Sequence, residues 1–148
     1  MTDFQAIADR VEIEALRGEF TDAGMQRDYD RVAALFAEDG VLRFPHIADG
    51  WVGRTEIRAA IARLQPSWEF FVQNTHPGVI ELDGDTATGR AYIQEFGRFQ
   101  DGTSHQNYAI YHDRYVRTPD GWKFAERRYE VRYVDSTPLP GTGTSPSP

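Results

Sequence analysis

Three turn signals divide the second half of the chain into four long segments, and this spacing constrains the fold more than any other feature. Asp83-Gly84-Asp85, Gln100-Asp101-Gly102 and Pro119-Asp120-Gly121 are typical of tight hairpin turns. The segments around them are rich in β-branched and aromatic residues and cover residues 70–82, 86–99, 104–117 and 122–134. Because consecutive strands joined by short turns usually pair with each other, we predict a four-stranded antiparallel arrangement.

The first half of the chain has helical periodicity instead. Apolar residues recur at three- to five-residue steps over residues 4–25, and shorter patterns of the same kind cover residues 28–36 and 55–64. One strand is expected between them, at residues 41–44. The prediction is an α+β domain over residues 1–135, in which three N-terminal helices pack against a curved antiparallel sheet.

The last thirteen residues, 136–148, are almost entirely Pro, Gly, Ser and Thr. Such a segment has too little apolar surface to offset the entropy lost on ordering, so we expect a disordered tail and no second domain.

Composition excludes several classes of function. The chain has 148 residues, no cysteine and a net charge of −7. Thiolate nucleophiles, disulfides and cysteine–zinc sites are therefore excluded, and the scattered basic residues argue against a nucleic-acid partner. No apolar run approaches the roughly 20 residues of a membrane span, and the N-terminus lacks a signal-peptide pattern. We expect a cytoplasmic protein with no membrane partner.

Motifs for metals, cofactors and covalent catalysis are also missing from the sequence. No two of the four histidines have the i, i+4 or H-x-H spacing of metal ligands. Neither a phosphate-binding loop nor a dinucleotide fingerprint is present, and Ser67 and Ser104 have no triad context. We expect neither a metal nor a cofactor.

Ionisable groups lie among aromatic residues in the last predicted hairpin. Asp113 and Arg127 stand at comparable distances from the turn at residues 119–121, so they should face each other across the strand pair. Tyr111 has the same parity as Asp113 and should share its face of the strand. The two charged residues could form a buried ion pair that fixes the register, or present an anion and a cation to a ligand.

Three short phrases in this order identify a resemblance. Residues 36–40 (FAEDG), 81–87 (ELDGDTA) and 120–124 (DGWKF) resemble the SnoaL-like families of the nuclear-transport-factor-2-like superfamily, with the closest likeness to scytalone dehydratase and the dehydrochlorinase group. The resemblance covers roughly residues 4–134. It implies a cone-shaped sheet that is wrapped around three helices and encloses one pocket.

The residues that resemble the catalytic positions of this family match only in part. The eliminating enzymes of the family resemble one another in an Asp on the first helix and a His on the first long strand, which form a base dyad. Here these positions are Met25 and Gln73, and neither side chain can act as a base. The Asp of the third long strand and the Arg of the last strand do match, at Asp113 and Arg127.

The resemblance and the residue chemistry together suggest roles. His76 lies three residues beyond Gln73 and is either the general base or a surface histidine before Pro77. Tyr111 and Arg127 are candidates to stabilise an oxyanion, with Asp113 as the orienting group. Asp22 could replace the missing Asp, or be a solvated carboxylate. The remaining candidates for contact with substrate are Phe20, Asp22, Met25, Phe44, Trp68, Phe70, Gln73 and His105.

The leading functional hypothesis is a cofactor-independent enzyme that abstracts a proton from a small hydrophobic, cyclic, oxygenated molecule. Dehydratase, isomerase and polyketide-cyclase reactions all fit this description. The alternatives are a ligand-binding domain without chemistry and an accessory subunit of a larger enzyme, because both dyad positions are replaced. Aromatic residues on the outer face of the sheet lead us to expect a homodimer or homotrimer.

Overall fold

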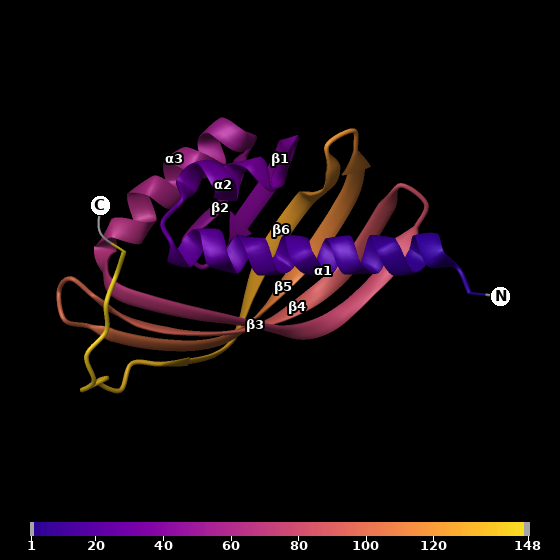
Figure 1. Ribbon diagram of the computed structural model, residues 1–148. Helices are drawn as coiled ribbons and strands as arrows, with labels where there is room; N and C mark the ends of the chain where they lie inside the picture. The colour runs from indigo at the N-terminus through magenta and orange to yellow at the C-terminus, as the bar shows by residue number, and fades with distance from the viewer. Residues whose placement is uncertain (1, 147–148) are drawn as a thin grey trace.

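The computed structural model describes residues 2–146, in which three helices pack against a six-stranded sheet (Figure 1). The helices are α1 (Phe4–Met25), α2 (Tyr29–Ala34) and α3 (Arg54–Leu64), the last followed by a 3-10 turn, η1 (Gln65–Ser67). The strands are β1 (Phe36–Phe44), β2 (Ala48–Val52), β3 (Trp68–Asp83), β4 (Thr86–Phe99), β5 (Ser104–Thr118) and β6 (Gly121–Asp135). Among these residues no helix has the length and apolar character that crossing a membrane requires.

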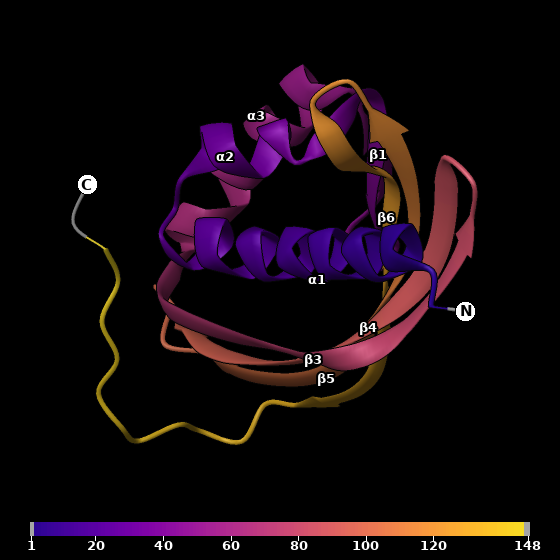
Figure 2. The ribbon, with the colours of Figure 1, turned by 45° about the vertical axis from the view of Figure 1, so that its right-hand side comes forward.

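The sheet is curved, with the strand order β2-β1-β6-β5-β4-β3, and α1 lies along its concave side (Figure 2). The predicted α+β class and the four long hairpin-connected strands are confirmed. Two details differ from the prediction. The sheet is not wholly antiparallel, because β1 runs parallel to β6, and the five-residue strand β2 was not predicted.

The second helix is shorter than predicted because its last expected residue belongs to the sheet. Phe36 pairs with Phe124 and starts β1, so α2 ends at Ala34. Gly40 lies inside β1, where a Cβ atom would come within 3.0 Å of the carbonyl oxygens of Ala37 and Phe124. The glycine thus permits close approach of two strands.

A bulge in β3 decides which of its residues face the concave side. The pairing with β4 shifts by one residue between His76 and Val79. At the bulge, a Cβ atom on Gly78 would lie 1.8 Å from the carbonyl oxygen of Arg90, so only glycine fits without backbone movement. Because side chains alternate along a strand, this one-residue shift turns Gln73 toward the concave face and His76 away from it.

The buried pair Asp113–Arg127 connects the two last strands, and the predicted alignment of these residues is confirmed. Arg127 Nε lies 2.9 Å from Asp113 Oδ1 and Nη2 lies 3.1 Å from Oδ2, with both side chains fully buried. The Tyr115 hydroxyl donates to Asp113 Oδ2 at 2.7 Å and accepts from Arg17 Nε at 2.8 Å. This network ties α1 to the centre of the sheet, and Arg17 was not singled out in the sequence.

The C-terminal segment has no helix or strand between residues 136 and 146, and it makes specific contacts with the sheet. Arg98 Nη1 donates to the carbonyl oxygens of Leu139 and Gly141, and the Leu139 amide donates to Ser104 Oγ. Figures 1 and 2 show this yellow segment continuing from β6 below the sheet and then turning up past the edge of the sheet toward the helices. Gly143 packs on Phe70, where a Cβ atom would lie 2.1 Å from the ring. Backbone polar groups and one glycine therefore hold a segment that has almost no apolar side chains.

Replacing Gly143 by Ala should detach this segment and lower the free energy of unfolding by about 2 kcal/mol, since Phe70 would lose its cover. Gly141→Ala is the matched control, because a Cβ atom there meets nothing within 4 Å. Urea unfolding of both variants checks the prediction. Equal stability of the two variants would contradict it.

Candidate active site

A cavity of about 270 Å³ lies between α1, α3 and the concave face of the sheet, just below the usual volume range of ligand pockets. Its wall is mostly apolar and aromatic. The apolar and aromatic members are Phe20, Val32, Phe44, Ile47, Ile61, Leu64, Trp68, Phe71, Phe99, Tyr111 and Tyr129. The polar members are His46, Gln65, Ser67, Gln73, Glu95, His105 and Asn107.

Glu95 is the centre of the polar part of this wall. Its Oε1 accepts hydrogen bonds from the hydroxyl of Tyr129 and, at 3.3 Å, from Asn107 Nδ2. Its Oε2 accepts from Gln73 Nε2 at 2.9 Å. An ionised carboxylate offers about four lone-pair positions, so three donors leave one position, on Oε2, for another partner.

Four neighbouring strands bring these residues together. Gln73 on β3 pairs with Glu95 on β4, which pairs with Asn107 on β5. On β6, Tyr129 pairs with Tyr111, whose side chain lies on the same concave face. The polar group is therefore built from backbone register in the rigid part of the fold.

The two tyrosines are buried, and burial is the main cause of their altered acidity. Burial raises the pKa of Tyr111, and the nearby charge of Arg127 opposes this increase. Burial and the charge of Glu95 raise the pKa of Tyr129. Both phenols are thus protonated at neutral pH and act as hydrogen-bond donors.

Two histidines also line the cavity. His46 follows β1, and its ring centroid lies 5.4 Å from that of Tyr129. His105 begins β5 and lies 6.0 Å from Trp68, centroid to centroid. Burial lowers the pKa of His46, with Glu95 opposing the shift, so its imidazole is neutral at pH 7. No group of three His, Asp or Glu within residues 2–146 is arranged to hold a metal ion.

The sequence profile of the SnoaL-like domain matches residues 5–128, which is most of the chain. The chain belongs to the SnoaL-like family. This agrees with the three short phrases in the sequence and with the helix-lined, open curved sheet.

Solved structures of related fold cover nearly the whole SnoaL-like chain. The hexachlorocyclohexane dehydrochlorinase LinA-type3 of Novosphingobium barchaimii is 22% identical, with a TM-score of 0.84 over 99% of this chain and 100% of that one. A proposed scytalone dehydratase of Novosphingobium aromaticivorans is 19% identical, with a TM-score of 0.81 over 97% of both chains. A proposed aromatic ring hydroxylase from the same species is 26% identical, with a TM-score of 0.82 over 88% of this chain and 94% of that one.

Six of the residues predicted to contact substrate or to act in catalysis line the cavity of this SnoaL-like protein. They are Phe20, Phe44, Trp68, Gln73, His105 and Tyr111. Their placement agrees with the prediction, whereas their roles stay predictions.

His76 and Phe70 do not line the cavity. His76 has the surface position that was one of its two predicted alternatives, whereas the predicted place of Phe70 in the substrate wall is wrong. The bulge in β3 turns His76 to the outer face, where its side chain is exposed and its strand neighbour is Tyr92. Phe70 also faces outward and is buried by the C-terminal segment. We therefore do not retain His76 as the base.

Asp113 and Arg127 lie behind the cavity wall. The carbon Cζ of Arg127 lies 3.9 Å from the ring centroid of Tyr111 and 4.5 Å from that of Phe20, so these rings separate the cation from the cavity. Arg127 thus supports Tyr111 from behind and does not reach a ligand. Asp113 orients Arg127, not a catalytic base.

Asp22 and Met25 are also outside the cavity lining. Asp22 is exposed and pairs with Arg31 at 2.9 Å, as the solvated-carboxylate interpretation predicts. Met25 lies next to the lining, because its Sδ accepts from the amide of Gln73 at 3.4 Å.

Glu95, the one carboxylate among the described residues of the cavity lining, was not predicted, and neither was Tyr129. The positions of Glu95 and Tyr129 could both have been predicted from the alignment of the hairpin strands. The hairpin alignment that pairs Asp113 with Arg127 also pairs Tyr111 with Tyr129. The turn at Asp101-Gly102 likewise places Glu95 opposite Asn107.

Proposed function

We propose that this SnoaL-like protein is a cofactor-independent enzyme of the lyase or isomerase type, which removes a proton beside a carbonyl group of a small, largely apolar substrate. The observation that carries the proposal is a carboxylate, Glu95, in an apolar cavity next to buried phenol donors. The dehydrochlorinase and dehydratase names of two structural neighbours support an elimination.

The free position on Glu95 Oε2 would receive the proton from the substrate carbon. The electron pair of the broken C–H bond moves into the carbonyl group and gives an enolate, to which the Tyr111 hydroxyl donates a hydrogen bond. The enolate then expels a leaving group on the neighbouring carbon, or is protonated at another carbon by the Glu95 acid. Net charge in the cavity stays at −1 throughout, because the enolate forms as Glu95 is neutralised.

Deuterium exchange tests this proposal without knowledge of the natural substrate. The protein is incubated in D₂O with a panel of small cyclic ketones and hydroxyketones, and mass spectrometry follows deuterium uptake at the carbon beside the carbonyl. We expect uptake faster than in buffer for at least one compound. Compounds that bind in the cavity but never exchange would contradict the enzymatic proposal.

A non-catalytic binding domain is the second candidate. Met25 and Gln73 favour it, since they occupy the positions that resemble the family's base dyad and contact each other without an ionisable group. This candidate predicts binding without deuterium uptake.

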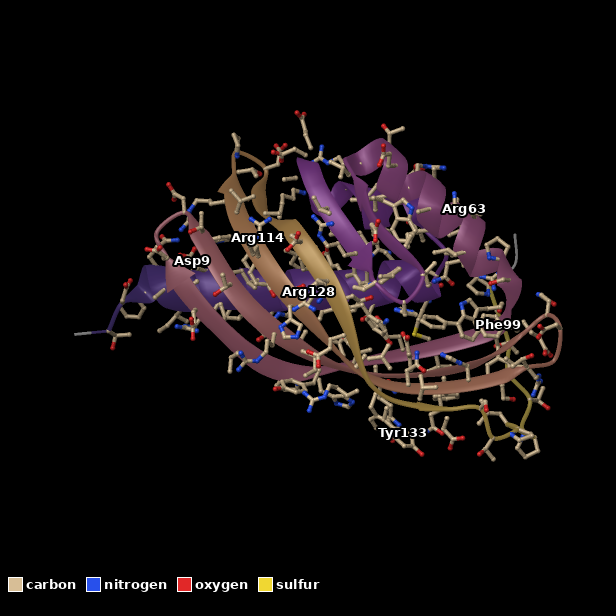
Figure 3. All side chains as sticks on the ribbon, turned by 180° about the vertical axis from the view of Figure 1, so that it is seen from behind. Asp9, Arg63, Phe99, Arg114, Arg128 and Tyr133 are labelled. Atoms are coloured by element: carbon tan, nitrogen blue, oxygen red, sulfur yellow. The ribbon has the colours of Figure 1, made fainter. Side chains whose placement is uncertain are left out.

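Self-association stays a prediction. The outer face of the sheet exposes Tyr92, Tyr108 and Tyr133, each more than 40% accessible. Figure 3 shows this face, on which Tyr133 and the charged residues Arg114 and Arg128 point outward. A second copy on this face would cover these aromatic side chains.

A further inference from the structure

The charge of the cavity wall is unbalanced. Glu95 is the only Asp, Glu, Lys or Arg among the described residues that line the cavity. Burial lowers the pKa of the lining residue His46, so its imidazole does not supply a compensating cation. A ligand therefore meets one negative charge.

The nearest buried cation does not neutralise this charge. Arg127 donates hydrogen bonds from Nε and Nη2 to the carboxylate of Asp113, so the two residues form an ion pair with zero net charge. Its remaining nitrogen, Nη1, has no hydrogen-bond partner and belongs to a guanidinium that is packed among the rings of Phe20, Tyr111 and Phe124.

The hydrogen bonds around Glu95 all point toward it and match its ionised form. Thr21 Oγ1 donates to Gln73 Oε1 at 2.6 Å, which turns the Gln73 amide nitrogen toward Glu95. The Thr21 hydroxyl has a single proton, so its contact with Thr75 must be donated by Thr75. A directed chain thus runs from Thr75 through Thr21 and Gln73 to the carboxylate.

The rest of the wall also favours positive over negative charge. Aromatic rings present a negative face that attracts cations, and Phe44, Trp68, Phe71 and Phe99 line the same cavity as the polar group. Asn107 adds a buried carbonyl oxygen, Oδ1, that has no donor. An anionic ligand would find Coulomb repulsion in a medium of low dielectric constant.

We propose that the cavity selects its ligands by charge: it takes small molecules whose polar end is uncharged or cationic, and rejects carboxylates and phosphates, with Glu95 as the specificity-determining residue. This inference rests on the proposed function only for the location of the binding site. It does not require that the protein catalyse a reaction, because charge selection can be measured from ligand binding alone.

Three probes with one skeleton test the proposal by calorimetry at pH 7 and about 0.15 M salt, where general surface charge is screened. They are 2-phenylethylammonium, 2-phenylethanol and 3-phenylpropionate. We expect the ammonium to bind most tightly and the carboxylate at least about tenfold more weakly than the alcohol. In Glu95→Gln the carboxylate and the alcohol should bind within about threefold of each other.

Glu19→Gln is the matched control, because it removes the same charge from an exposed site on α1. This variant should keep the wild-type order of affinities. Equal affinity of carboxylate and alcohol in the wild type would overturn the proposal, as would retention of the charge order in Glu95→Gln or failure of all three probes to bind. A charge order without deuterium uptake from any ketone would leave the charge selection standing and remove the enzymatic proposal.

Discussion

Replacing Arg127 by Met should lower the free energy of unfolding by about 3–5 kcal/mol, because it leaves Asp113 buried without its cation. Burial disfavours the charged guanidinium, yet the charge and hydrogen bonds of Asp113 raise the pKa of Arg127, so the guanidinium is ionised in the folded protein. The only remaining donor to Asp113 among the described contacts would be the Tyr115 hydroxyl. Urea unfolding measures the loss.

Two further variants separate the buried pair from a general effect of losing an arginine. Arg58→Met removes an exposed arginine that is paired with Asp30, and it should leave stability nearly unchanged. The double variant Arg127→Met with Asp113→Leu removes both buried charges and should recover most of the lost stability. A loss of less than about 1 kcal/mol in the single variant would contradict a buried, mutually dependent pair.

Hairpin turns made much of the sheet predictable from the sequence. Each Gly-containing turn brings the strands beside it into antiparallel pairing, so Asp113 and Arg127 were expected close to each other across the last hairpin. Their direct pairing also depends on a one-residue register shift between Arg114 and Tyr115, because the turn itself pairs Thr118 with Gly121. The first helix was predictable for a similar reason, because its periodicity over Phe4–Met25 is continuous.

The candidate site was harder to predict, because one inserted residue reverses the facing of a strand. Without the bulge at Gly78, His76 would have the parity of Ile80, which is buried against the core. The close approach of Gly78 to the Arg90 carbonyl depends on the packed sheet and leaves no periodic signal. The same reversal brings Gln73 into contact with Glu95.

The burial of Arg127 behind the cavity wall was the second property that could not be predicted from the sequence. An Arg on the concave face of a strand could reach a ligand or lie beneath aromatic rings, and parity alone does not distinguish these arrangements. The rings of Phe20 and Tyr111 come from α1 and β5, and only their packing places Arg127 behind them.

Glu95→Gln should reduce enzymatic deuterium uptake by about 100-fold or more, which is the usual contribution of a positioned general base. The substitution keeps the size of the side chain but removes its charge and its ability to accept a proton. His46→Asn is the informative comparison, since His46 lines the same cavity and its neutral imidazole is another proton acceptor. Glu19→Gln controls for net charge.

The central claim is that Glu95 removes the proton, and the rate of deuterium uptake by one responsive ketone tests it most directly in these four proteins. Our account predicts wild-type rates for Glu19→Gln, nearly wild-type rates for His46→Asn, and a loss of about 100-fold for Glu95→Gln. Unchanged uptake in Glu95→Gln, with loss of uptake in His46→Asn, would contradict it and assign the base to His46.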